Sequence, residues 1–80
     1  MIKEFPHHVA WTDAMADGGS FVGLIEYQRK LPFSCVHILW VINPAISDQI
    51  EAELSATKML EKICRITDSD TVVYDDGVAL

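Results

Sequence analysis

The feature that most constrains the fold of this chain is a turn sequence between two apolar segments. Residues 17–20 read Asp-Gly-Gly-Ser, a cluster typical of tight turns. Residues 21–28, which follow the turn, are rich in β-branched and aromatic side chains. Residues 8–15, which precede it, fit either a strand with Val9 and Trp11 on one face or a short helix, and we predict the strand. The turn between these segments then predicts a β-hairpin.

A second strand signal is the most hydrophobic stretch of the chain, residues 33–42. This stretch is apolar on both faces, which predicts a central strand with a helix on one side. The N-terminal segment or a second subunit could cover its other side. Residues 71–74 predict a further strand, and residues 78–80 predict a short last strand.

One long helix is predicted over residues 48–66, with Ser47 as its N-cap. Asp48 and Glu51 fall in its first turn, where the helix dipole favours acids. Glu53 and Glu61 fall inside the expected apolar arc, so either the helix bends near residues 55–57 or these acids line the edge of a contact. At about 100° per residue, the apolar face of this helix consists of Ile46, Ile50, Leu54, Leu60, Ile63 and Cys64.

These elements predict a single α+β domain over residues 1–80. Its expected architecture is an antiparallel sheet of three to five strands with one long helix packed on a face. Half of the 80 residues are hydrophobic, but so small a domain has little interior, so we expect apolar side chains on its surface and a homodimer. The longest apolar run is far shorter than the ~20 residues of a membrane span, so we expect a soluble protein without a membrane partner.

The chain is acidic, with a formal net charge of −6. The charge is uneven, because residues 44–80 carry eight acidic against three basic residues, whereas residues 1–43 carry four against three. An acidic surface opposes direct binding to nucleic acid, whose phosphates are neutralised by Lys and Arg. It favours a protein or ribonucleoprotein partner with a basic surface.

The nucleophile and metal-ligand residue types form no catalytic or cofactor motif. Cys35 and Cys64 each lie in an apolar run, and residues 1–6 lack the apolar stretch of a secretory signal, so we expect two reduced, buried thiols in a cytoplasmic protein. His7 and His8 would point to opposite faces of a strand, and we interpret them as surface residues. Cys35 and His37 are interpreted as core residues. We predict no enzyme activity, no metal site and no cofactor.

The candidate functional residues are therefore acids and aromatics. The predicted partner-binding surface combines the acidic first turn of the helix with a C-terminal turn, and it consists of Asp48, Glu51, Asp75 and Asp76. Aromatic side chains are common anchors at interfaces. The possible interface aromatics are Trp11, Tyr27 and Trp40, with a core position as the alternative for Trp40.

In its small size and acidic character, the chain resembles the inhibitors that phages and mobile elements encode, anti-CRISPR proteins among them. This resemblance implies a protein that binds an RNA-guided effector complex and blocks the access of that complex to DNA, in the host cytoplasm if a phage encodes it. Such effectors present basic channels that attract an acidic domain. Two alternatives stay open: an antitoxin-like or regulatory subunit, and a small ligand- or metal-binding protein.

Overall fold

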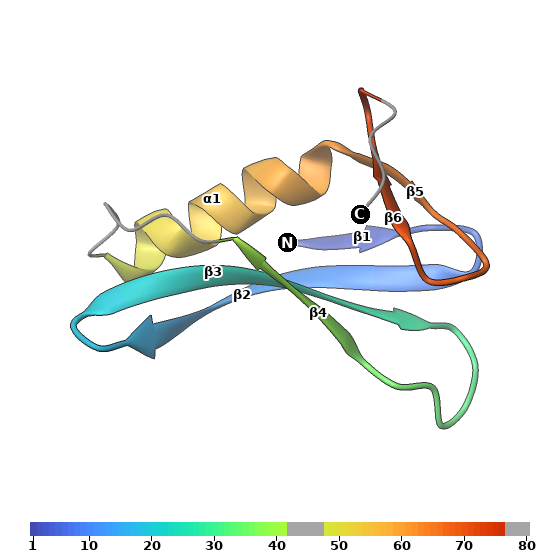
Figure 1. The fold of residues 1–80 in the computed structure, drawn as a ribbon, viewed down its shortest axis with the longest axis horizontal. Coiled ribbons are helices and arrows are strands. Elements are labelled where there is room, and N and C mark those ends of the chain that lie inside the picture. Colours follow the sequence, from blue (N-terminus) through green and yellow to red (C-terminus); the bar gives the residue numbers. More distant parts are fainter. Residues whose placement is uncertain (42–47, 77–80) are drawn as a thin grey trace.

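The computed structural model describes residues 1–41 and 48–76, and it has an α+β fold (Figure 1). Four strands form an antiparallel sheet in sequence order. They are β1 (Ile2–Glu4), β2 (His8–Asp17), β3 (Ser20–Arg29) and β4 (His37–Val41). A single helix packs on one face of this sheet, so the predicted fold class is confirmed.

The long hairpin between β2 and β3 forms where the turn sequence predicts it. Asp17 pairs with Ser20, and the ladder extends to the pair of His8 with Arg29. Gly18 and Gly19 both have positive φ angles, 52° and 87°, as a two-residue type I′ turn requires. The helical alternative for residues 8–15 is wrong, and the strand is confirmed.

The helix α1 (Gln49–Glu61) begins close to the predicted position but ends earlier. Its N-cap is Asp48, whose side chain accepts a hydrogen bond from the Ile50 backbone N–H at 3.0 Å. The predicted N-cap, Ser47, lies outside the described residues. Instead of continuing to residue 66, the chain leaves the helix at Lys62 and forms β5 (Ile63–Ile66). β5 pairs with β6 (Val72–Tyr74), so tertiary pairing overrides the helical pattern in this segment.

The face of α1 that packs on the sheet differs from the predicted one. Its buried residues are Ala52, Ala56 and Leu60, spaced four apart, whereas Ile50 and Leu54 are exposed. Glu53 and Glu61 are also exposed and lie outside this buried row. A small-residue face lets the helix approach the sheet closely at Gly23, where a Cβ atom would collide with the backbone oxygen of Ala52.

The main core lies between α1, the sheet and the β5–β6 hairpin. Its buried members come from all of these elements and are Phe5, Ala10, Ile25, Ala56, Leu60, Ile63 and Val72. Lys3 of β1 fastens the end of the helix to the sheet, because its Nζ donates to the carbonyl oxygen of Ile63 at 2.7 Å and to that of Leu60 at 3.4 Å. A cation near the C-terminal end of a helix is also favoured by the helix dipole.

The prediction of a central strand over residues 33–42 is wrong. β4 is shorter and lies at the edge of the sheet, with β3 as its neighbour. Phe33 is fully exposed with a φ angle of 63°, which breaks the extended run before β4 begins. The N-terminal segment does not cover β4, since it forms β1 and β2 of the same sheet. The predicted last strand, residues 78–80, lies outside the described residues.

Candidate functional site

The sheet has one face covered by α1 and one face that no other described element covers (Figure 1). Successive side chains of a strand alternate between faces. Ala10 and Ile25 point toward α1, so their neighbours Trp11 and Leu24 point to the opposite side, here called the open face. Its apolar members are Ile2, Val9, Trp11, Met15, Val22, Leu24, Ile38 and Trp40.

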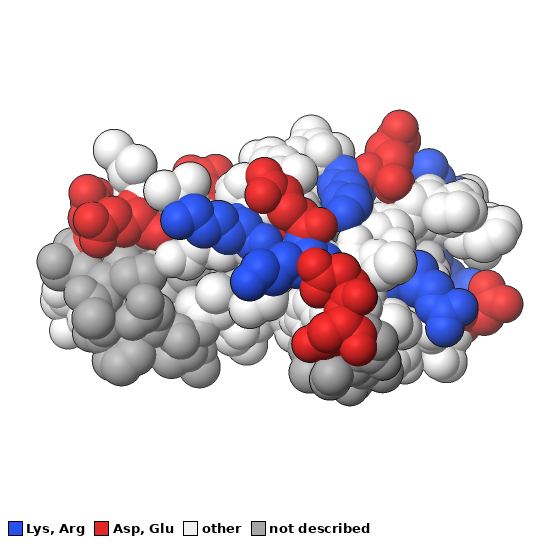
Figure 2. Space-filling view, turned by 90° about the horizontal axis from the view of Figure 1, so that it is seen from above, with Lys and Arg blue, Asp and Glu red and all other residues white. Residues whose placement is uncertain are grey.

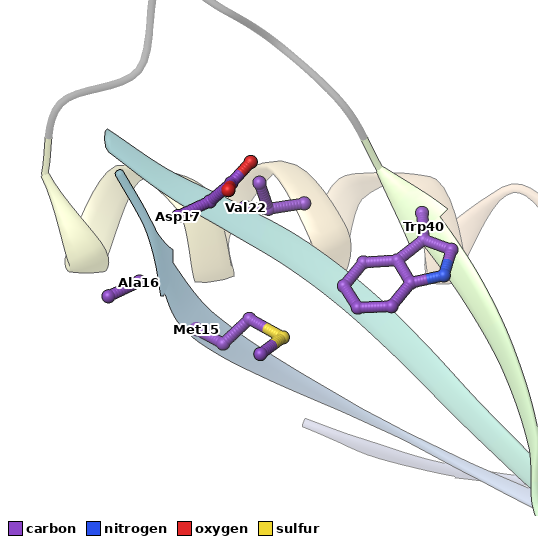
Figure 3. A pocket seen from close by; sticks show the side chains of 5 residues that line it. All are labelled: Met15, Ala16, Asp17, Val22 and Trp40. Carbon is purple, nitrogen blue, oxygen red and sulfur yellow. The ribbon is translucent and has the colours of Figure 1, made fainter. Parts of the chain in front are cut away.

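A shallow pocket of about 360 Å³ lies on the open face. Met15, Val22 and Trp40, from three adjacent strands, supply its apolar lining, and Asp17 supplies a carboxylate at its margin (Figure 3). The side chains of Met15 and Trp40 are 47% and 50% exposed. Leu24, the register partner of Trp40 on β4 and of Asp13 on β2, is only 5% exposed, so its neighbours shield this side chain from water.

The charged residues that the strands place on the open face are all acidic. They are Glu4, Asp13, Asp17 and Glu26. Lys30, just after β3, pairs with Glu4 at 3.5 Å, and this ion pair occupies one end of the face. The open face therefore combines apolar side chains with carboxylates that lie among them, since Asp13 is the register partner of Leu24 and Glu26 pairs with both Trp11 and Ile38.

A polar network lies on the other side of the sheet, around Asp70 in the turn between β5 and β6. The Oδ1 atom of Asp70 accepts hydrogen bonds from Nε2 of His8 at 2.8 Å and from Nε of Arg29 at 2.9 Å. His37 lies 3.5 Å from its Oδ2 atom. The hydroxyl of Tyr27 donates to the backbone oxygen of Asp70 at 3.0 Å, and its ring stacks on that of His37.

These contacts change the acidity of two groups in the network. The hydrogen bond from His8, aided by the charge of Arg29, lowers the pKa of Asp70. Burial, aided by the charge of Asp70, raises the pKa of Tyr27. His8 is fully buried, which corrects its interpretation as a surface residue, and its Nδ1 atom has no hydrogen-bond partner among the described residues. The network fastens the β5–β6 turn to the ends of β2, β3 and β4.

The predicted acidic surface separates into two parts. Asp48 and Glu51 lie at the beginning of α1, whereas the backbone N–H of Asp75 donates to the oxygen of Lys62, just after the end of the helix. A helix of 13 residues is about 20 Å long, so Asp75 and Asp76 lie far from the other two acids. From the side of α1, acidic and basic side chains alternate rather than form one acidic patch (Figure 2).

The three predicted aromatics are divided between the two faces of the sheet. Trp11 and Trp40 lie on the open face, whereas Tyr27 lies on the covered face. Trp40 is half exposed, so its alternative position in the core is wrong. Met15 of the pocket was not a predicted site residue, although its place in the alternation with Val9 and Trp11 could have indicated it.

The expectation that Cys35 and Cys64 are buried is wrong. Both are exposed free thiols; Cys35 precedes β4, and Cys64 lies within β5. Within residues 1–41 and 48–76, no three His, Cys, Asp or Glu side chains are grouped to hold a metal ion. In the same part of the chain, no helix has the length and apolar character needed to cross a membrane.

Comparisons with protein-family models, curated proteins and solved structures found no match to this chain.

Proposed function

We propose that this chain is a non-enzymatic binding domain and that the open face contacts its partner. The observation that carries this proposal is the apolar pocket of the open face, where Trp40 and Met15 are half exposed and Asp17 lies at the margin. The water-facing side of an antiparallel sheet is usually polar. Contiguous exposed apolar side chains with a polar margin are typical of protein interaction sites.

The chemistry of the open face favours a partner with aliphatic or aromatic groups beside Lys or Arg. Asp13, Asp17 and Glu26 would attract such cations, and the net charge of −6 acts in the same direction over longer distances. Proteins that handle nucleic acids present basic surfaces of this kind. We therefore propose a partner of the RNA-guided effector type, which the chain would prevent from binding DNA in the cytoplasm.

Self-association is the second part of the proposal. The chain would act as a homodimer, because its short sequence leaves apolar side chains on the surface even after the core has formed.

A peptide selection tests the proposed specificity of the open face. A random peptide library selected on the immobilised chain should yield sequences that combine aromatic or aliphatic residues with Lys or Arg. Met15→Lys should abolish binding of these peptides, because it places a cation in the pocket. Glu51→Lys is the matched control on the helix and should preserve binding. Selected peptides without basic residues, or peptides that bind Met15→Lys unchanged, would contradict the proposal.

A competition assay tests the proposed partner. The chain is added to purified RNA-guided effector complexes, and their binding to labelled target DNA is followed by fluorescence anisotropy. The wild-type chain should weaken DNA binding by an effector that it recognises, Met15→Lys should not, and the chain alone should leave the DNA signal unchanged. Binding of the chain to the DNA itself would exclude this function. Binding of the basic peptides without any effect on effectors would instead favour an antitoxin-like or regulatory subunit.

A further inference from the structure

The two edges of the four-stranded sheet differ in how they are protected. Exposed strand edges offer unpaired backbone groups to other chains, and proteins protect them with short strands, charges, proline or bulges. β1 has only three residues, and Lys3 and Glu4 are two of them. β4 reads His-Ile-Leu-Trp-Val, without acidic or Lys/Arg residues, proline or glycine. Its outer edge pairs with no strand in the described part of the chain.

The sequence of β4 is also complementary to itself when two copies run antiparallel. A two-fold axis at Leu39 would pair all five residues, with Leu39 opposite its own copy. Ile38 of each chain would then lie opposite Trp40 of the other, on the open face. Aromatic and β-branched residues stabilise each other as cross-strand neighbours, and both side chains are about half exposed in the single chain.

We infer that β4 is the dimerisation site of this protein and that it pairs antiparallel with β4 of a second copy about an axis at Leu39. The two sheets become one continuous sheet, with both helices on one side and both open faces on the other. This inference rests on the homodimer part of the proposed function, and it adds the residues that form the contact. It does not depend on which partner the open face binds.

Charge favours this arrangement over stacking of two open faces. Stacking would bring Asp13, Asp17 and Glu26 toward the same acids of the second copy, which destabilises an interface. Pairing through β4 keeps these acids apart, because all of them lie on β2 and β3. Pairing also places Ile38 of one chain beside Trp40 of the other, so each open face gains apolar surface from the second copy.

The test uses two complementary variants of the full chain and measures mass by light scattering over a range of concentrations. The wild type should approach about 18 kDa, twice the chain mass of 9.0 kDa. Ile38→Lys and Trp40→Glu should each raise the dimer dissociation constant by about tenfold or more, since each change acts twice across the axis. Circular dichroism should confirm that both variants fold, because both positions are half exposed.

Mixing the two variants makes the test specific for the register. In a mixed dimer, the introduced lysine faces the introduced glutamate, and the native pair of Ile38 with Trp40 remains on the other side of the axis. An equimolar mixture should therefore form dimers that neither variant forms alone. Met15→Lys is the matched control, since Met15 is equally exposed on the open face but lies on β2, and it should dimerise like the wild type.

Four results would overturn this inference. A wild type that stays monomeric at every concentration would exclude the dimer, although its open face could still bind basic peptides and the binding function would stand. A dimer that Ile38→Lys and Trp40→Glu leave unchanged would place the contact elsewhere. Loss of the dimer in Met15→Lys would indicate stacked open faces instead of paired β4 strands. No recovery in the mixture of the other two variants would exclude the pairing of Ile38 with Trp40 about an axis at Leu39.

Discussion

Asp70 holds together parts of the chain that are far apart in the sequence. Its carboxylate contacts His8 on β2 and Arg29 on β3, and His37 of β4 lies nearby. Its backbone has a φ angle of 62°, in the left-handed region, which Asp adopts more readily than most residues other than glycine. The hydrogen bonds of the side chain and of the backbone oxygen hold the residue in this conformation. One carboxylate thus joins the turn between β5 and β6 to three strands of the four-stranded sheet.

Asp70→Asn should lower the thermal stability of the protein at neutral pH, because the amide removes the charge that His8 and Arg29 contact. The pKa of Asp70 in the folded chain lies below its ordinary value of 3.8. Its contribution to stability is therefore present above about pH 4 and is lost as the pH falls through the lower pKa of the folded state. Melting temperatures from pH 7 to pH 2 should show a gap between wild type and variant that closes in acid.

Asp68→Asn is the control for this measurement, since Asp68 is exposed in the same turn. It should leave the melting temperature near that of the wild type at neutral pH. A gap between Asp70→Asn and the wild type that stays constant down to pH 2 would mean that the charge of Asp70 contributes nothing to folding.

Contacts between residues that are far apart in the chain could not be predicted from the sequence. His8 and Asp70 are 62 positions apart, and nothing local to either residue indicates that they meet. His8 was predicted at the surface and is buried. Cys35 and Cys64 show the opposite error, because their apolar neighbours suggested burial whereas both thiols are exposed. Burial of a residue in a short strand depends on which face the tertiary structure covers, and hydrophobicity alone does not determine that face.

Among the elements, the contact between α1 and β3 depends on the absence of a side chain at Gly23. A Cβ atom there would collide with the backbone oxygen of Ala52, which cannot rotate away as a flexible side chain could. Gly23→Ala should therefore shift α1 away from the sheet and destabilise the protein by about 1–3 kcal/mol, the usual cost of overpacking. Urea unfolding followed by circular dichroism measures this loss.

Met15→Ala is the control for the glycine substitution, because Met15 is exposed on the opposite face of the same sheet. Its effect should stay within about 0.5 kcal/mol, as is usual for surface positions. If Gly23→Ala were as stable as this control, the close approach of α1 to β3 would have no energetic importance.

Local signals predicted the elements that depend on local geometry. The glycine turn predicted the hairpin of β2 and β3, acids in the first turn predicted where α1 begins, and β-branched residues predicted β6. The predictions that were wrong concern elements whose position depends on which other strands they pair with. Ile63–Ile66 fits a helical pattern but pairs with β6, and the apolar run before and within β4 suggested a central strand although it forms an edge.

At the scale of the whole molecule, the covered face and the open face of the sheet differ in character. The sequence indicated part of the open face. Trp11 and Trp40 were candidates from the sequence, and both lie on the open face. The acids of that face lie on β1, β2 and β3, in the half of the sequence with little net charge. Charge along the sequence therefore indicated residues 44–80, whereas the structure places carboxylates of residues 1–43 on the open face, with Asp17 at the apolar pocket.

Charge reversal can distinguish which surface binds the partner. Three double variants, Asp13→Lys/Asp17→Lys, Asp48→Lys/Glu51→Lys and Asp75→Lys/Asp76→Lys, each change the net charge from −6 to −2. Attraction over long distances is thus weakened equally in all three, and differences between them report direct contact. Circular dichroism first establishes that each variant folds, because loss of the Asp48 N-cap alone costs about 0.5–2 kcal/mol.

We expect only the open-face pair, Asp13→Lys/Asp17→Lys, to weaken binding to the selected basic peptides by about tenfold or more, since several short-range charge contacts add together. The wild type should also bind more weakly as salt rises, because the screening length falls from about 10 Å at 0.1 M to about 3 Å at 1 M. The open-face variant should lose more of this salt dependence than the other two, because it loses direct charge contacts as well as long-range attraction. Isothermal titration calorimetry at both salt concentrations measures these effects. If the larger loss occurs instead in Asp48→Lys/Glu51→Lys or Asp75→Lys/Asp76→Lys, the partner binds on the helix side of the molecule, and the open face is not its binding site.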